Sequence, residues 1–123
     1  MYRSMMQVYV NGSREAVELY QKAFDAKLVA SYLNEDGTFM HAELDIYGQI
    51  LAVSEATPEK SRVEGNCMQF CLHFGEDNEA IVQKAFDTLK EKAIIDFPLG
   101  KCDFSPLMTS LVDKFGIFWC IFI

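Results

Sequence analysis

The sequence contains no apolar stretch that approaches the ~20 residues needed by a membrane-spanning helix. Its first ten residues, MYRSMMQVYV, also lack the long apolar region and the small-residue cleavage site of a secretory leader. We therefore expect a cytoplasmic protein with no membrane segment.

Positive charge is scarce as well. Eleven Lys and Arg residues stand against 18 Asp and Glu residues, which gives a net charge of −7 and a pI near 4.7. Such a surface repels phosphate backbones and anionic lipids, so we expect neither nucleic acid nor membrane as a partner. A cationic ligand remains compatible with the charge.

Several motifs of catalytic and metal sites are missing. The sequence has no P-loop, GxGxxG, HExxH or serine nucleophile elbow, and its four cysteines form no CxxC pair. Cys67 and Cys71 are four residues apart on a predicted strand, about 13 Å along it, which is too far for a disulfide. We expect reduced thiols that pack as small apolar side chains.

The remaining composition, 123 residues of which half are hydrophobic, is enough for one compact domain. In the first half, an apolar stripe with helical spacing follows a short strand, with Ser13 as the expected N-cap. Three strands separated by turn signals come next. The predicted order is a strand at 5–10, a helix over 11–26, and strands at 27–34, 39–46 and 49–55.

The second half repeats this order of elements. It has a predicted strand at 67–74, a helix over 78–92, short β structure, a loop at 97–106 and strands at 107–112 and 117–123. QKAFDA at 21–26 returns as QKAFDT at 83–88, and a Tyr-Gly before a strand returns as Phe-Gly. We predict an α+β fold of two βαβββ modules, about 1–56 and 67–123, joined by a linker at 57–66 within a single domain.

Three segments carry a family resemblance: EAVELYQKAF after the first strand, HAELDIYGQILAVSE in the third and fourth, and DKFGIFW before the last. With the repeat, they resemble the vicinal-oxygen-chelate superfamily, which includes glyoxalases, bleomycin-resistance proteins and dioxygenases, and within it the PhnB-like branch. The resemblance implies curved mixed sheets, with helices on the convex side and a ligand cavity on the concave side.

Alternation along the strands indicates which side chains line that cavity. On the third strand, the apolar residues Met40, Ala42, Leu44 and Ile46 should face the helix, which leaves His41, Glu43 and Asp45 on the concave side. On the fifth strand, Met68, Phe70, Leu72 and Phe74 should lie under the helix. The ligand-binding candidates are Gln7, Tyr9, His41, Glu43, Gln69, Cys71, Trp119 and Cys120.

The resemblance also implies four metal-ligand positions, on strands one, four, five and eight. They fall on Met5, Ala52, Gln69 and Cys120, and only Gln69 is a ligand type that the family uses. A divalent ion needs several N, O or S donors that converge on one point. We therefore expect no standard metal site and no cofactor, although a rearranged site on His41 and Glu43 remains open.

Two classes of function follow from the resemblance. The first is a protein that binds a small organic ligand, which could be cationic, without the standard metal site. The second is an enzyme of the same superfamily, a glyoxalase-like or dioxygenase-like lyase or isomerase with an atypical metal site or with His41 and Glu43 as acid and base. We also expect a homodimer, because open sheet edges and the aromatic C-terminal strand IFWCIFI would otherwise leave apolar side chains in water.

Overall fold

A computed structural model describes residues 1–58 and 63–123. The chain divides into two compact units, Met1–Val63 and Glu64–Ile123. Part of the linker predicted at 57–66 lies outside the described residues, because it includes positions 59–62. Each unit has one sheet and one helix of its own.

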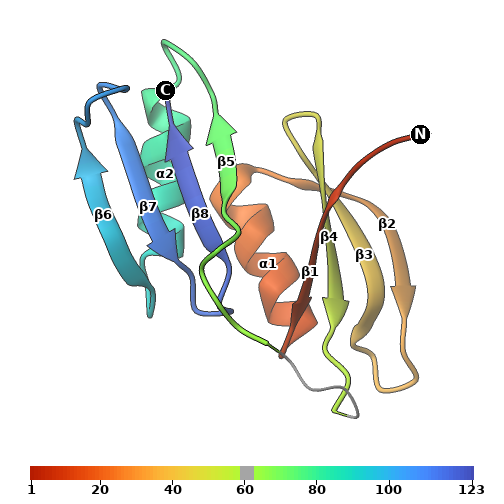
Figure 1. Ribbon diagram of the computed structural model, residues 1–123. Coiled ribbons are helices and arrows are strands. Elements are labelled where there is room, and N and C mark those ends of the chain that lie inside the picture. Colours follow the sequence, from red (N-terminus) through yellow and green to blue (C-terminus); the bar gives the residue numbers. More distant parts are fainter. Residues whose placement is uncertain (59–62) are drawn as a thin grey trace. The chain divides into compact units, whose positions relative to one another are not determined.

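The first unit contains β1 (Met6–Val10), α1 (Ser13–Phe24), β2 (Lys27–Leu33), β3 (Phe39–Ile46) and β4 (Gln49–Glu55). Its strands lie side by side in the order β1-β4-β3-β2 (Figure 1). β1 is parallel to β4, and the other two pairs of neighbours are antiparallel. The predicted bounds of β3 and β4 are confirmed.

The second unit contains β5 (Phe70–His73), α2 (Glu79–Leu89), β6 (Ile94–Gly100), β7 (Met108–Val112) and β8 (Phe118–Phe122). Its strand order, β5-β8-β7-β6, follows the same scheme, with β5 parallel to β8. The prediction of two βαβββ modules is therefore confirmed. The loop predicted at 97–106 starts later, because β6 continues to Gly100.

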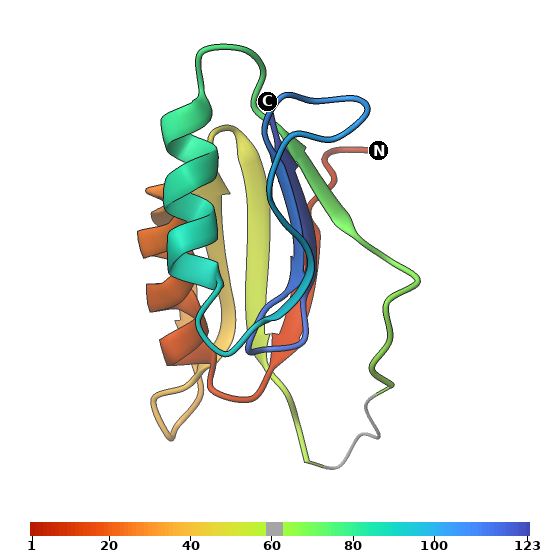
Figure 2. The same ribbon diagram turned by 90° about the vertical axis from the view of Figure 1, so that its left-hand side faces the viewer.

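Each helix covers one face of its own sheet (Figure 2). In the first unit, α1 packs on β1, β3 and β4 with buried Ala16, Tyr20, Ala23 and Phe24 from the predicted stripe. In the second, α2 packs on β7 and β8. The face of each sheet that its own helix does not cover is called the open face from here on.

The start of α1 differs from the prediction. Ser13 is the first helical residue, and Gly12 precedes it with a φ of 93°, a conformation that glycine adopts without steric cost. The carboxylate of Glu55, at the end of β4, caps the helix by accepting the N–H groups of Gly12 at 3.0 Å and Ser13 at 2.8 Å. The Ser13 hydroxyl instead accepts the N–H of Phe39 at 2.8 Å, where β3 begins.

Two apolar residues assigned to helix packing are exposed instead. Met40 lies near the start of β3 and is exposed, whereas Ala42, Leu44 and Ile46 on the same face are buried. Met68 is also exposed, because β5 begins at Phe70 rather than at 67. The helix-facing surface of each strand is therefore shorter than the alternating pattern predicts.

The C-terminal strand is an interior strand. β8 lies between β5 and β7, and its residues 119–121 are buried. The expectation that this strand leaves apolar side chains in water is therefore wrong. Among the described residues, no helix combines the length and the apolar character required to cross a membrane.

Candidate functional site

The open face of the first sheet gathers the polar candidates of that unit. Gln7 on β1 and Glu43 on β3 are both register partners of Ala52 on β4, and residues paired in this way project to the same side of a sheet. Their neighbours in sequence, such as Val8 and Leu44, project to the opposite side and are buried. The alternation of β3 thus separates a polar face from an apolar one, as predicted.

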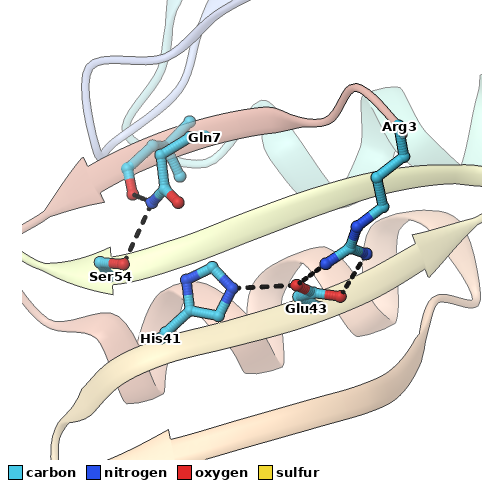
Figure 3. Close-up of polar contacts among 6 residues, drawn as sticks. Arg3, Gln7, His41, Glu43 and Ser54 are labelled. Carbon is cyan, nitrogen blue, oxygen red and sulfur yellow. Dashed lines mark hydrogen bonds and ion pairs between the residues drawn. The ribbon is translucent and has the colours of Figure 1, made fainter. Parts of the chain in front are cut away.

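Glu43 is the centre of this face (Figure 3). The guanidinium of Arg3 donates two hydrogen bonds to its two carboxylate oxygens, from Nη1 to Oε2 at 2.9 Å and from Nη2 to Oε1 at 2.8 Å. From the other side, Nε2 of His41 lies 3.0 Å from Oε1. These groups, Arg3 first and His41 second, lower the pKa of Glu43 from 4.5 to about 2. The carboxylate is therefore ionised at neutral pH.

The surroundings of Glu43 are polar and aromatic. The Gln7 amide donates to the Ser54 hydroxyl at 3.1 Å and to the backbone carbonyl of Val8 at 3.0 Å (Figure 3). Tyr9, the register partner of Ser54, is 60% exposed. Tyr32 on β2 pairs with His41, with 6.4 Å between the ring centroids, and is also exposed.

Arg3, Tyr32 and Ser54 contribute to this face but are not among the candidates predicted from the sequence. Arg3 precedes β1 and contacts Glu43, which is 40 positions away, so no local sequence pattern predicts this pair. Tyr32 had a weak signal, since it is an aromatic residue on the strand predicted next to the one that carries His41.

The open face of the second sheet carries the remaining candidates. Cys71 on β5 and Ser110 on β7 are both register partners of Cys120 on β8, so the three share one face. The Gln69 amide donates to the Ser110 hydroxyl at 3.0 Å, and the Cys71 thiol donates weakly to the Gln69 carbonyl oxygen at 3.7 Å. Ser110 in turn donates to Asp96 at 2.9 Å. Gln69 is thus part of a hydrogen-bonded chain within its own sheet.

The cysteines are free thiols. Burial, together with the neighbouring Cys71, raises the pKa of Cys120 to about 11. The thiolate is the nucleophilic and metal-binding form of cysteine, and Cys120 has little of it at neutral pH. Its chemistry on this face is therefore that of a small apolar side chain.

Trp119 belongs to the core rather than to a ligand site. The residue is 0% exposed, its ring packs edge-on against Phe70 at 5.5 Å, and its indole N–H donates to the Asp113 carboxylate at 2.9 Å. As the register partner of Leu111, which is also buried, it projects to the side away from Cys120. Trp119 was predicted as a ligand contact, and because its ring has no accessible surface, it is not included in the site proposed below.

The four metal-ligand positions implied by the resemblance do not fit a divalent ion. Met5 offers only a thioether, Ala52 has no donor atom, the Gln69 amide is hydrogen-bonded within its sheet, and Cys120 holds its proton. Within residues 1–58 and 63–123, no group of three or more His, Cys, Asp or Glu side chains is arranged to hold a metal. The side chains present supply too few donors and too little negative charge.

The sequence matches one family model. The model describes the Glyoxalase/Bleomycin resistance protein/Dioxygenase superfamily, and the match covers residues 4–121, nearly the whole chain. The chain belongs to this superfamily. No curated protein sequence matches it significantly.

Solved structures share the fold at low sequence identity. Protein PA1353 from Pseudomonas aeruginosa has a TM-score of 0.82 and 21% identity, over 99% of this chain and 97% of its own. The PhnB protein from Bacillus cereus, a putative 3-demethylubiquinone-9 3-methyltransferase, also has a TM-score of 0.82, with 20% identity over 98% of both chains. A mutant of the fosfomycin resistance protein FosX from Listeria monocytogenes, complexed with Mn(II) and 1S,2S-dihydroxypropylphosphonic acid, has a TM-score of 0.71 and 12% identity over 98% and 90% of the two chains.

These likenesses concern the fold alone. The FosX structure contains a metal ion. In the present chain, the four metal-ligand positions implied by the resemblance carry side chains that do not fit one. The ligand and the activity must therefore be argued from this chain's own residues.

Proposed function

We propose that this superfamily member binds a small organic molecule on the open face of its first sheet, around Glu43 and His41, and does so without the standard metal site. The observation that carries the proposal is Glu43 itself. The residue is only 8% exposed, yet its carboxylate is held ionised on a sheet face with no apolar cover from its own helix. A charge in that position is costly unless it is paired, and it offers a strong interaction to any matching ligand group.

The neighbours of Glu43 suit a ligand of mixed polarity. Gln7 and Ser54 supply amide and hydroxyl groups, and the exposed rings of Tyr9 and Tyr32 supply flat apolar surfaces beside them. Small-molecule sites commonly combine aromatic walls with a few polar groups that fix the orientation of the ligand. This combination favours binding over a purely structural role for the polar cluster.

A second candidate function, acid and base catalysis, is supported by the contact between His41 and Glu43. When a neutral His41 donates its Nε2 proton to Glu43, the ring's lone pair lies on Nδ1, and this atom is then the base. The His41 side chain is about one third exposed, so a substrate could reach the ring. An isomerase that moves a proton on a bound molecule would need these features and no metal.

The proposed function is tested by screening small fragments against the full chain after dialysis against EDTA. Ligand-observed NMR would measure the binding of neutral, anionic and cationic fragments to the wild type, to Glu43→Gln and to His41→Ala. Fragments that bind the metal-free wild type and lose binding in Glu43→Gln would support the proposal. The matched control is Glu18→Gln, which removes an exposed carboxylate from α1.

Two outcomes would contradict the proposal. One is binding that appears only when Mn²⁺ or Zn²⁺ is added back. The other is binding that is equal in Glu43→Gln and the wild type, which would locate the ligand elsewhere. Conversion of a bound fragment that is lost in His41→Ala would favour the catalytic alternative.

A further inference from the structure

The segment before β1 reaches the proposed site through the side chain of Arg3. Met1 and Tyr2 are fully exposed, and β1 begins only at Met6. Arg3 lies between Tyr2 and the start of β1. Its side chain extends to β3, where the guanidinium binds both carboxylate oxygens of Glu43 (Figure 3). Its side chain remains 45% exposed, so the guanidinium lies on the open face and is not part of the core.

The contact has the form of ligand recognition. Two nearly parallel N–H···O bonds, at 2.9 and 2.8 Å, match the fork of a planar guanidinium to the two oxygens of one carboxylate. His41 binds Oε1 from the opposite side and thereby restrains the rotation of the carboxylate. Any small cation with two coplanar N–H groups could make the same pair of bonds in place of Arg3.

We infer that Glu43 is a binding site for the guanidinium or amidinium group of a small organic cation, and that Arg3 is the site's intramolecular occupant, displaced when the ligand binds. This inference rests on the proposed function and specifies the class of ligand. Tyr9 and Tyr32, exposed on the same face, would contact the rest of such a cation, since aromatic rings attract cationic groups.

Competition with Arg3 has a measurable consequence. The apparent dissociation constant of an outside cation is raised by the factor 1 + K, where K is the equilibrium constant for docking of Arg3. Part-exposed ion pairs of this kind correspond to a K of roughly 1.4 to 5. Removal of the Arg3 side chain should therefore tighten the binding of a cation about two- to sixfold.

The experiment uses three probes of similar size: benzamidine, a planar amidinium; benzylamine, a compact ammonium; and benzamide, which is neutral. Binding to the full chain would be measured by titration NMR for the wild type, Arg3→Ala, Arg3→Lys and Glu43→Gln. We expect benzamidine to bind best, to bind about two- to sixfold more tightly to Arg3→Ala, and to lose binding in Glu43→Gln. Arg3→Lys, which keeps the charge but loses the fork, should give an intermediate affinity.

Arg14→Ala is the matched control. It removes one positive charge from the same unit, but Arg14 lies on α1 and donates to the backbone carbonyl of Gly37 at 2.8 Å. A general electrostatic effect would tighten benzamidine binding equally in Arg14→Ala and Arg3→Ala, and this result would overturn the inference. Thermal unfolding of each variant shows that the folded protein is being compared.

Several other results would overturn the inference without touching the proposed function. They are unchanged or weaker benzamidine binding in Arg3→Ala, equal binding of benzamide or benzylamine, and no binding of benzamidine to any variant. If neutral or anionic fragments bind in a Glu43-dependent manner while benzamidine does not, the site is real and the ligand class inferred here is wrong. If no fragment of any charge depends on Glu43, the proposed function itself fails.

Discussion

His41 and Leu44 are neighbours on β3 that project to opposite faces of the first sheet. Leu44 is fully buried under α1, and its truncation to Ala should cost roughly 2 to 5 kcal/mol of unfolding free energy, as expected for a large-to-small change in a core. His41→Ala removes a part-exposed polar side chain and opens no apolar void, so its cost should be small. Urea unfolding of both variants tests this difference. A loss for His41→Ala that equals or exceeds the loss for Leu44→Ala would place the polar cluster in the core.

Glu43 should give the protein a distinct dependence on acid pH. Its pKa is lower in the folded state, about 2, than its ordinary value of 4.5. The ion pair with Arg3 and the contact with His41 therefore stabilise the fold fully above about pH 4.5, and this stabilisation is lost as the pH falls toward 2. The wild type should be more stable than Glu43→Gln at neutral pH, and the difference should shrink over that interval. Urea midpoints that differ by a constant amount down to pH 2 would contradict this account.

The same residues show how far a sequence can specify a site. The side of β3 on which His41 and Glu43 lie follows from alternation alone, because every second residue of the strand is apolar and three of these four, Ala42, Leu44 and Ile46, are buried. The partner of Glu43 does not follow, since Arg3 lies 40 residues away in a segment without periodicity. Trp119 shows the opposite limit: its strand was correctly predicted, but two candidates on consecutive positions, Trp119 and Cys120, necessarily face opposite sides.

At the scale of elements, the residue that caps α1 could not be predicted from the local sequence. A serine at the start of a helical stripe predicts an N-cap, but the carboxylate of Glu55 takes that role because β4 ends beside the first turn of the helix. Burial alone would raise the pKa of Glu55, and the hydrogen bonds from Ser13 and Gly12 outweigh it and lower the pKa. The carboxylate is thus ionised at a helix N-terminus, where negative charge is favourable.

We predict that Glu55→Ala lowers the unfolding free energy by about 0.5 to 2 kcal/mol, the usual cost of removing a helix cap. Glu18→Ala is a suitable control, because Glu18 is an exposed carboxylate in the middle of the same helix and its removal should change stability by less than about 0.5 kcal/mol. Chemical denaturation at neutral pH measures both. Equal effects of the two substitutions would mean that the cap contributes nothing beyond the loss of a surface charge.

The order of elements was easier to predict than their ends. The repeated sequence segments and turn glycines predicted the order of elements in both modules. The hairpin turn at Tyr47 and Gly48 has the positive φ angles, 48° and 95°, of a tight turn. The start of β5 was placed three residues early, since Cys67 and Met68 continue an alternating pattern without packing against anything that buries them. Pattern specifies faces, whereas tertiary contacts decide where a strand ends.

For the whole molecule, the residues at the four inherited ligand positions predict the metal content. With Met5, Ala52, Gln69 and Cys120 there, we expect less than one tightly bound divalent ion per chain after dialysis. Elemental analysis of the purified protein measures this directly. Stoichiometric metal that is lost in Gln69→Ala would show that the positions still bind an ion and would contradict the proposed metal-independent function.

The edge strand β2, and not the interior strand β8, provides a physical basis for assembly. β8 is buried between its neighbours, whereas β2 is exposed along most of its length, including the apolar side chains of Leu28, Val29 and Leu33. Irregularities of register at two points along β2 hinder simple pairing of edges, so a partner should cover these side chains by packing. We expect a homodimer at micromolar concentration.

Sedimentation velocity should therefore give a species of twice 14.0 kDa for the wild type. Val29→Lys should shift the protein toward the monomer, because a charge on an exposed edge opposes association. Ile94→Lys places the same charge on β6, the corresponding edge of the second sheet, where Ile94 is also exposed. Dissociation by Ile94→Lys alone would assign the interface to the second unit, and a wild type that sediments only as a 14.0 kDa species would contradict the dimer altogether.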